Sequence, residues 1–223
     1  MAEPKQLEPE VYQGQFGEFT ITQSDRTGVQ IYRTGLMVAA IAFATGTALV
    51  LWRGNDSGTI ALLTPLYACF CLALGVSLVT IHIYLAILHR LLQAFWLIGA
   101  IAAVALNFQS QEPLAITVTT NTAALLAIGF TFAALTGIYF KEAFCFDRLE
   151  TKILTPLVPL LILGHLFGLL SPFPEKLLLA TWAGLFLIFA LRKTIQPIPA
   201  DIGDKSVFEH LKSRQRVASE LAE

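Results

Sequence analysis

The sequence has little charge for its length. Only 14% of its 223 residues are Asp, Glu, Lys or Arg, whereas a soluble domain carries about a quarter. The charges lie in short islands between long apolar runs, and the mean hydropathy is +0.65. This shortage of charge excludes an ordinary soluble domain and predicts a protein that crosses a membrane several times.

Cysteine and recognisable catalytic motifs are also scarce. Three cysteines cannot build a disulfide framework, and we expect Cys69 and Cys71, two residues apart in an apolar run, to act as packing residues. The sequence contains no phosphate-binding loop, dinucleotide fingerprint, zinc-protease helix motif or nucleophile elbow. An enzyme would therefore have to work without a known motif, and a non-enzymatic role is favoured.

Long apolar runs dominate the rest of the chain and predict an all-α fold, a transmembrane bundle of six helices. About 20 helical residues cross the roughly 30 Å of hydrocarbon in a bilayer. The apolar run from 59 to 108 is too long for one crossing, and its only break is His89-Arg90, so we expect the chain to reverse there. The expected spans are residues 34–52, 59–88, 91–108, 114–140, 153–170 and 177–191.

The flanking segments are polar. We divide the chain into an N-terminal segment (1–33), a transmembrane domain (34–192) and a C-terminal tail (193–223). The first 33 residues hold no apolar run, so we expect no cleaved signal. The first 25 residues are acidic and hold one basic residue, Lys5, so we expect no transit peptide.

Shorter patterns appear inside these flanks. Residues 11–21 are compatible with a short hairpin. Turn-forming residues follow it, namely Ser24, Asp25, Thr27 and Gly28. Ser206 and Glu209 match a capping box, which predicts a tail helix that is either solvated or a docking element.

Basic residues are sorted to one side of the expected membrane. With six spans, 13 of the 15 Lys and Arg residues lie on the side that holds both termini, and only Arg53 and Lys176 lie on the other. Basic residues are enriched on the cytoplasmic side of membrane proteins. Both termini are therefore expected to be cytoplasmic, or stromal in a plastid.

Charged and reactive groups gather in residues 141–152 (KEAFCFDRLETK), which we expect to form a loop. Glu142 and Cys145 lie three residues apart and would share one helical face, with His89 from the neighbouring turn as a base. The spacing gives no metal site. The loop is either a solvated, ion-paired turn or a candidate cytoplasmic docking cluster, composed of Arg90, Lys141, Glu142, Cys145, Asp147 and Arg148.

Three polar residues are candidates for a role inside the membrane. His82 and His165 fall within expected spans, where ionisable groups are often functional. Either histidine could ligate a chlorophyll or haem, or hydrogen bond to a neighbouring helix, but their depths differ too much for both to ligate one haem. Asn121 belongs to a polar collar, residues 117–122, at the outer end of the fourth span. The cofactor is left unassigned.

Two stretches together carry a family resemblance, VYQGQFGEFTITQSDRTGVQIYRTGL (11–36) and GFTFAALTGIYFKEAFCF (129–146). They resemble the integral-membrane family catalogued as domain of unknown function 2301, found in cyanobacteria and plastids. The resemblance extends over about residues 11–192 and implies a thylakoid or plasma membrane of a photosynthetic lineage. It supplies no catalytic or binding residues.

Three functions remain open. The leading hypothesis is a non-enzymatic accessory or assembly protein whose cytoplasmic face docks a membrane protein complex. The alternative is a transporter of a small solute or ion that uses His82, His165 and the polar collar, and third comes an enzyme built around Glu142 and Cys145. The expected partners are membrane lipid and protein, not nucleic acid. Gly129, Ala133 and Gly137 would allow either internal helix packing or a homo-oligomer.

Overall fold

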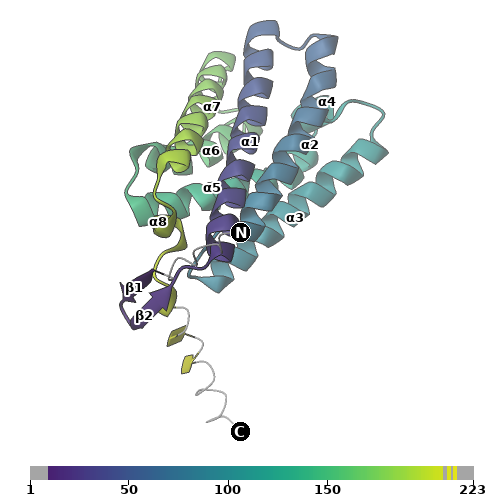
Figure 1. Cartoon of the computed structure of the whole chain (residues 1–223). Coiled ribbons are helices and arrows are strands. Elements are labelled where there is room, and N and C mark those ends of the chain that lie inside the picture. Colours follow the sequence, from purple (N-terminus) through teal and green to yellow (C-terminus); the bar gives the residue numbers. More distant parts are fainter. Residues whose placement is uncertain (1–9, 208–209, 212, 215–223) are drawn as a thin grey trace, which may run out of the picture.

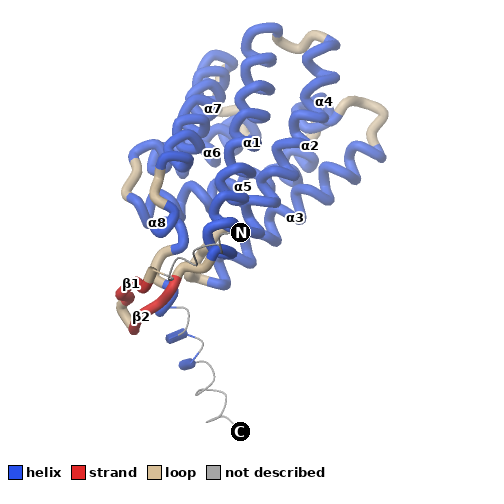
Figure 2. Tube along the Cα trace, in the orientation of Figure 1, coloured by secondary structure: helices blue, strands red, loops and turns tan. Residues whose placement is uncertain are grey.

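The computed structural model describes residues 10–207, 210–211 and 213–214. Within them the chain forms a two-stranded hairpin and eight labelled helices (Figures 1 and 2). The elements are β1 (Val11–Gly14), β2 (Gly17–Thr20), α1 (Gln23–Arg53), α2 (Ser57–Thr80), α3 (Ala86–Gln109), α4 (Leu114–Thr120), α5 (Thr122–Phe146), α6 (Leu149–Leu166), α7 (Pro172–Ile195) and α8 (Ile198–Ile202).

Six of the described helices are long and apolar enough to cross a membrane, which confirms the predicted six-helix bundle. They are α1, α2, α3, α5, α6 and α7. The hairpin and α8 lie beside one another where α1 begins (Figure 1). We call this the terminal end of the bundle, and the end where α1 passes into α2 the opposite end.

Helix α1 begins eleven residues before the predicted start of the first span. Thr22 caps it, because the Thr22 hydroxyl accepts from the Asp25 amide at 3.2 Å and the Asp25 carboxylate accepts from the Thr22 amide at 2.8 Å. This reciprocal pair is a capping box. The turn expected over Ser24–Gly28 is therefore wrong, since the side chains that favour turns also favour helix starts.

The chain reverses between α2 and α3 at residues 81–85, so the break predicted at His89-Arg90 is wrong. Both of those residues lie inside α3. The loop needs no glycine or proline, because Ile81 and Ile83 are buried against the bundle. His89 Nε2 lies 2.6 Å from the Leu78 carbonyl, and Gln93 Nε2 donates to the same oxygen at 3.2 Å. These side chains satisfy a carbonyl that the end of α2 leaves unpaired.

The predicted fourth span is two helices, α4 and α5, that meet at Asn121. The Asn121 side chain accepts from the amides of Ala123 and Ala124 at 2.9 and 3.2 Å, so it caps α5. Asn121 is exposed and serves as a helix cap. The hairpin expected within residues 11–21 is present, with Val11 paired to Thr20.

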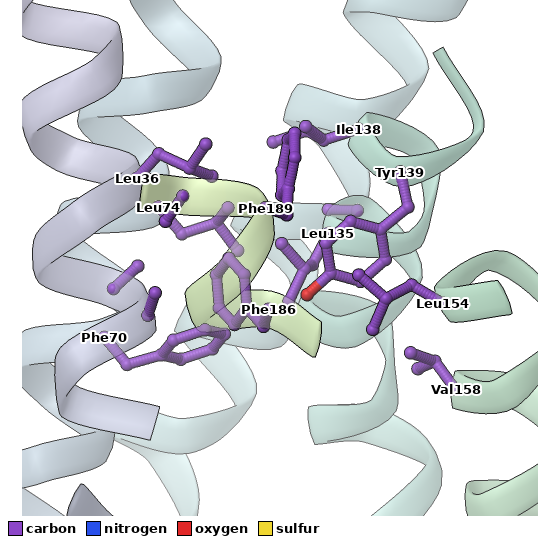
Figure 3. Close-up of a cluster of buried hydrophobic side chains, with 14 of the residues drawn as sticks. Leu36, Phe70, Leu74, Leu135, Ile138, Tyr139, Leu154, Val158, Phe186 and Phe189 are labelled. Carbon is purple, nitrogen blue, oxygen red and sulfur yellow. The ribbon is translucent and has the colours of Figure 1, made fainter. Parts of the chain in front are cut away.

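The core fills the middle of the bundle with side chains from six helices, and Figure 3 shows part of it. Tyr139 is fully buried, and its hydroxyl accepts from Trp182 Nε1 at 3.2 Å. Lipid tails are as apolar as these side chains, so close packing rather than the hydrophobic effect holds the helices together. The labelled residues of the core are Leu36, Phe70, Leu74, Leu135, Ile138, Tyr139, Leu154, Val158, Phe186 and Phe189.

Helices α3 and α5 approach one another closely at a glycine. A Cβ atom on Gly99 would lie only 2.6 Å from the Thr131 backbone nitrogen. Gly137 packs against Leu92 in the same way, so this member of the predicted small-residue stripe serves internal packing. Gly129 has open space beside it and takes no part in this contact.

Candidate functional site

A cluster of ionised side chains is buried at the terminal end. The Lys193 ammonium of α7 lies 2.9 Å from Glu142 Oε2 of α5 and also pairs with Asp201 of α8. Neither Lys193 nor Glu142 has any exposed surface. Since an isolated buried charge is costly, each must be held by its partners.

Helix α1 joins the cluster through Arg33. Its Nε and Nη2 atoms donate to Asp201 Oδ2 at 2.8 and 2.6 Å, and Nη2 also donates to the Pro197 carbonyl at 3.2 Å. The other Asp201 oxygen accepts from Gln196 Nε2 at 3.2 Å as well as from Lys193. Asp201 therefore fastens the segment after α7 to the first helix.

Glu142 receives a second set of donors on its other oxygen. Lys141 Nζ lies 2.9 Å from Glu142 Oε1, and the Tyr32 hydroxyl donates to that atom at 3.3 Å. The Phe146 ring faces the cations, with its centroid 4.7 Å from Lys193 Nζ. We call Arg33, Lys141, Glu142, Lys193 and Asp201 the buried ion cluster; it joins α1, α5, α7 and α8.

A second group of charges lies beside this cluster. Arg192 Nη1 lies 2.8 Å from Glu150 Oε2, and Arg148 donates to the side-chain oxygen of Gln196. Among the described residues, Arg148 Nη1 and Glu150 Oε1 are buried without a hydrogen-bond partner, 3.9 Å from one another. This second group ties α6 to the end of α7.

The hairpin and the residues after α7 fold together into what we call the terminal cap, residues 11–20 and 198–206. A small apolar cluster packs the cap against the start of α1 and holds Ile21, Val29 and Ile202, with Tyr12, Phe19 and Ile198 packed against them. The Asp204 carboxylate accepts from the Gln15 amide at 2.6 Å, and the Ser206 hydroxyl accepts from the Phe16 amide at 3.0 Å. The two ends of the described chain thus form one structure.

Hydrogen bonds stabilise the ionised form of Asp204. The Gln15 amide and the Ser206 hydroxyl hold the pKa of its carboxyl below the usual value. The tail helix was predicted from Ser206 and Glu209, of which Glu209 lies outside the described residues. In the described part the Ser206 hydroxyl donates to Asp204 at 2.6 Å.

The loop between α2 and α3 completes the cap contacts. The Asp204 amide donates to the Tyr84 hydroxyl, next to Gly203, whose φ of 72° favours glycine. His82 lies in this loop, two residues beyond α2, so its predicted place inside a span is wrong. Burial lowers the pKa of His82, and the nearby carboxylate of Asp25 opposes that shift.

The structure divides the predicted docking cluster in two. Glu142 is fully buried, and Lys141 and Arg148 are mostly buried, whereas Cys145 is exposed. Glu142 and Cys145 therefore do not share a face. The expected loop over 141–152 is also wrong, because α5 continues to Phe146 and α6 begins at Leu149. Only two residues connect these helices.

The remaining members of that prediction lie on the surface. Arg90 is exposed in the second turn of α3. Asp147 adopts a left-handed conformation with φ 50° at the end of α5 and pairs with Lys152. These residues, with Cys145, form the accessible part of the predicted cluster.

The key residues of the buried ion cluster were missed from the sequence. Lys193 continues the core stripe of α7, four residues after Phe189 and seven after Phe186, both fully buried. A lysine at that helical spacing indicates a buried cation. Asp201 and Arg33 carry no comparable local signal, because their pairing crosses 168 residues of sequence.

The other polar candidates are far apart. His165 is exposed near the end of α6 at the opposite end, with Nδ1 2.8 Å from Glu175 Oε1. His82 lies at the terminal end. Within the described ranges, no group of three or more His, Cys, Asp or Glu residues could hold a metal ion. The two histidines therefore do not share a site.

Six membrane-length helices joined by short connections define an integral membrane protein with multiple spans. The chain belongs to the family described as uncharacterized integral membrane protein, domain of unknown function 2301, whose model matches residues 76–210. This confirms the family resemblance, while its cyanobacterial or plastid setting stays a prediction.

One relative is similar along most of its length. The chain is 30% identical over 193 residues to a protein of Haemophilus influenzae named as uncharacterized, which covers 83% of this chain and 92% of the relative. No solved structure matches the chain.

Proposed function

We propose that this membrane protein is a non-enzymatic accessory protein whose terminal cap docks a partner membrane protein. The supporting observation is that both terminal segments fold into one ordered surface, joined to the bundle by the buried ion cluster. A bundle that needed only to span the membrane could leave such segments unattached. The cap instead holds a fixed shape outside the spans.

The cap lies on the cytoplasmic side in this proposal. The described basic residues at the terminal end include Arg26, Arg33, Arg90, Lys141, Arg148, Lys152, Arg192, Lys193 and Lys205. Arg53 and Lys176 lie at the opposite end. This segregation supports cytoplasmic termini through the enrichment of basic residues on that side.

The docking surface combines exposed charge with exposed apolar groups. Arg90, Cys145 and Asp147 are accessible beside the cap. On the hairpin, Val11 and Phe16 are 58% and 48% exposed although they lie outside the spans. Lipid tails do not account for exposed apolar side chains there, so this surface favours a protein partner.

The type of membrane is proposed from the family resemblance alone. The resemblance to cyanobacterial and plastid proteins favours a thylakoid or plasma membrane of a photosynthetic lineage. The relative from Haemophilus influenzae lends that setting no support. We propose the plasma membrane or thylakoid as the location.

Crosslinking from the two ends of the bundle tests docking. In native membranes, an amine-reactive crosslinker is expected to join a single partner to Lys152 and Lys205 at the terminal end, and not to the exposed Lys176. The partner, purified and recombined with this chain, should bind it directly. Crosslinks that form equally through Lys176 would overturn the proposal.

A charge reversal with a matched control locates the surface. Arg90→Glu is expected to lower the crosslinking yield, while Arg53→Glu, an exposed arginine at the opposite end, should leave it unchanged. Glu142 and Lys141 are unsuitable for this test, because changing them would disturb the buried ion cluster.

Transport of a small solute or ion is the alternative function. It requires the purified chain alone to carry solute across vesicles, with His165→Ala abolishing the flux. If that flux is observed and Arg90→Glu leaves every interaction with a partner protein intact, the docking proposal is wrong. At the opposite end, the exposed His165 lies 2.8 Å from Glu175, a polar contact that this alternative would use.

A further inference from the structure

A cavity of about 330 Å³ lies in the half of the bundle toward the opposite end. Its walls come from α1, α2, α4, α5 and α7, and the short helix α4 forms one side through Leu114, Ala115 and Val118. The volume falls within the roughly 300–1,000 Å³ of small-molecule sites. The cavity lies apart from the buried ion cluster and the terminal cap.

The lining is almost entirely apolar. Most of its atoms belong to aliphatic and aromatic side chains such as Phe43, Phe70 and Phe132, and no charged residue takes part. Engineered apolar cavities of about 150 Å³ stay dry and bind hydrocarbons. This larger cavity therefore suits a hydrocarbon group and disfavours an ion, since burying an unpaired charge is costly.

Hydroxyl groups are the polar part of the lining and belong to Thr47, Thr64, Tyr67 and Thr119. The Tyr67 hydroxyl hydrogen bonds to Thr131 Oγ1 at 2.9 Å, and Thr119 donates to the Ala115 carbonyl at 3.1 Å. Thr47 lines the cavity and is only 6% exposed, and its hydroxyl makes no hydrogen bond within the described chain but keeps accessible surface. An accessible hydroxyl in an otherwise apolar wall can donate a hydrogen bond to a ligand that enters the cavity.

The depth of Thr47 indicates which part of a ligand it would meet. Thr47 lies six residues before Arg53 at the end of α1, about 9 Å at 1.5 Å per residue. That depth lies just inside the hydrocarbon layer if Arg53 marks its edge. The oxygen of an ester or carboxyl group at the head of an acyl chain would lie there, with the chain extending inward.

We propose that this cavity binds an acyl chain and that the carbonyl or carboxyl oxygen of the ligand accepts a hydrogen bond from Thr47. The chain comes from a membrane phospholipid or from a free fatty acid. Both present the same chemistry, a hydrocarbon with one oxygen-bearing end.

Trp182 reports whether the cavity is filled. It is only 3% exposed, and its ring lies 4.5 Å from Phe43 and 5.2 Å from Phe132 between centroids, both of which line the cavity. The other two tryptophans, Trp52 and Trp96, are replaced by Phe so that Trp182 alone fluoresces. Bromine on an acyl chain quenches tryptophan on close approach, and Trp182 has almost no surface exposed to the surrounding lipid.

The test uses vesicles in two arms. The first contains phosphatidylcholine with brominated acyl chains, and the second contains ordinary phosphatidylcholine with added brominated fatty acid. Loss of Trp182 fluorescence in the first arm assigns the ligand as phospholipid, and loss only in the second assigns a free fatty acid. No loss in either arm overturns the proposal.

Filling the cavity supplies the matched control. Gly46→Leu and Ala115→Leu add bulk to the lining and are expected to restore the fluorescence, while Gly184→Leu adds the same bulk to open space on α7 and should not. The two filling variants lie on different helices, so the test can still be made if one of them does not fold. Quenching that persists in both folded filling variants contradicts the proposal.

The Thr47 hydroxyl is tested by a substitution of equal shape. Thr47→Val is expected to weaken quenching by the bound chain, raising the ligand concentration for half-quenching about threefold to tenfold. The same change should leave the stability of the ligand-free protein almost unchanged, because the Thr47 hydroxyl makes no hydrogen bond within the described chain. An unchanged half-quenching concentration would remove Thr47 from the site.

Discussion

The Lys193 ammonium lies 2.9 Å from Glu142 Oε2, and neither side chain is exposed. The pair joins α7 to α5 across 51 residues of sequence, and Lys193 also pairs with Asp201 beyond the end of its own helix. Removing one partner from a buried pair leaves an uncompensated charge. Lys193 therefore links the end of α5 to the segment after α7.

Replacing Lys193 should destabilise the protein strongly. Lys193→Met removes the cation that Glu142 and Asp201 share, at a cost of up to roughly 3–5 kcal/mol, because each carboxylate keeps one other cation, Lys141 or Arg33. Unfolding in detergent can be followed by the reactivity of the buried Cys71 thiol, after Cys69 and Cys145 are changed to Ser. Lys176→Met, at an exposed site, should have almost no effect. Equal stability of the two variants would contradict a role for the cluster.

The contact between α3 and α5 should tolerate no side chain at Gly99. Gly99→Ala places a methyl group 2.6 Å from the Thr131 nitrogen, so the helices must separate, at a cost of about 1–3 kcal/mol. Gly129→Ala, on the same pair of helices but with open space beside it, is the control. The same thiol assay measures both, and a loss of stability at Gly129 equal to that at Gly99 would be inconsistent with this packing.

The attachment of the hairpin to the tail should weaken in acid. The pKa of Asp204 is lowered in the folded protein, so its contribution to stability is present above its unfolded pKa and is lost as pH falls through the folded value, below about pH 4. Hydrogen exchange at the Gln15 and Phe16 amides should rise there. Asp204→Asn should already show fast exchange at neutral pH; slow exchange in this variant would refute the contact.

The loop between α2 and α3 should respond at milder pH. Burial lowers the pKa of His82, so below about pH 6.5 the unfolded loop binds a proton that the folded loop resists, and stability falls as pH falls. The groups that act on this pKa are Asp25, Lys141, Asp201 and Lys205. Hydrogen exchange over residues 81–85 should accelerate between about pH 7 and pH 5.

His82→Gln should abolish this pH dependence, because it removes the titrating group. His165→Gln, at the opposite end of the bundle, should keep it. A pH dependence that survives the first change and disappears with the second would show that another histidine governs the loop.

The number of spans and the grouping of charges could be predicted from the sequence because both follow from local composition. A run such as residues 59–80 is long and apolar wherever it is placed, and basic residues mark the ends of spans. The ends of the helices were harder to predict from the sequence. The reversal at residues 81–85 depends on Ile81 and Ile83 being buried by other helices, which no local pattern shows.

The candidate site could be predicted only in part. The segment around Glu142 was identified by its density of charge, but that pattern does not show which side chains enter the bundle. Glu142 is buried because Lys193 and Tyr32 arrive from distant parts of the chain. Long-range pairs of this kind decide whether a charge is a docking group or a structural one.

Thiol labelling from outside the cell tests most directly the claim that both terminal segments form one cap on the cytoplasmic side. In a variant with Cys69→Ser, Cys71→Ala and Cys145→Ser, single cysteines are placed by Gln13→Cys in the cap and Asn55→Cys at the opposite end, both exposed positions. The proposal predicts that a membrane-impermeant reagent labels position 55 in intact cells and position 13 only after permeabilisation. Labelling of position 13 from outside would contradict it.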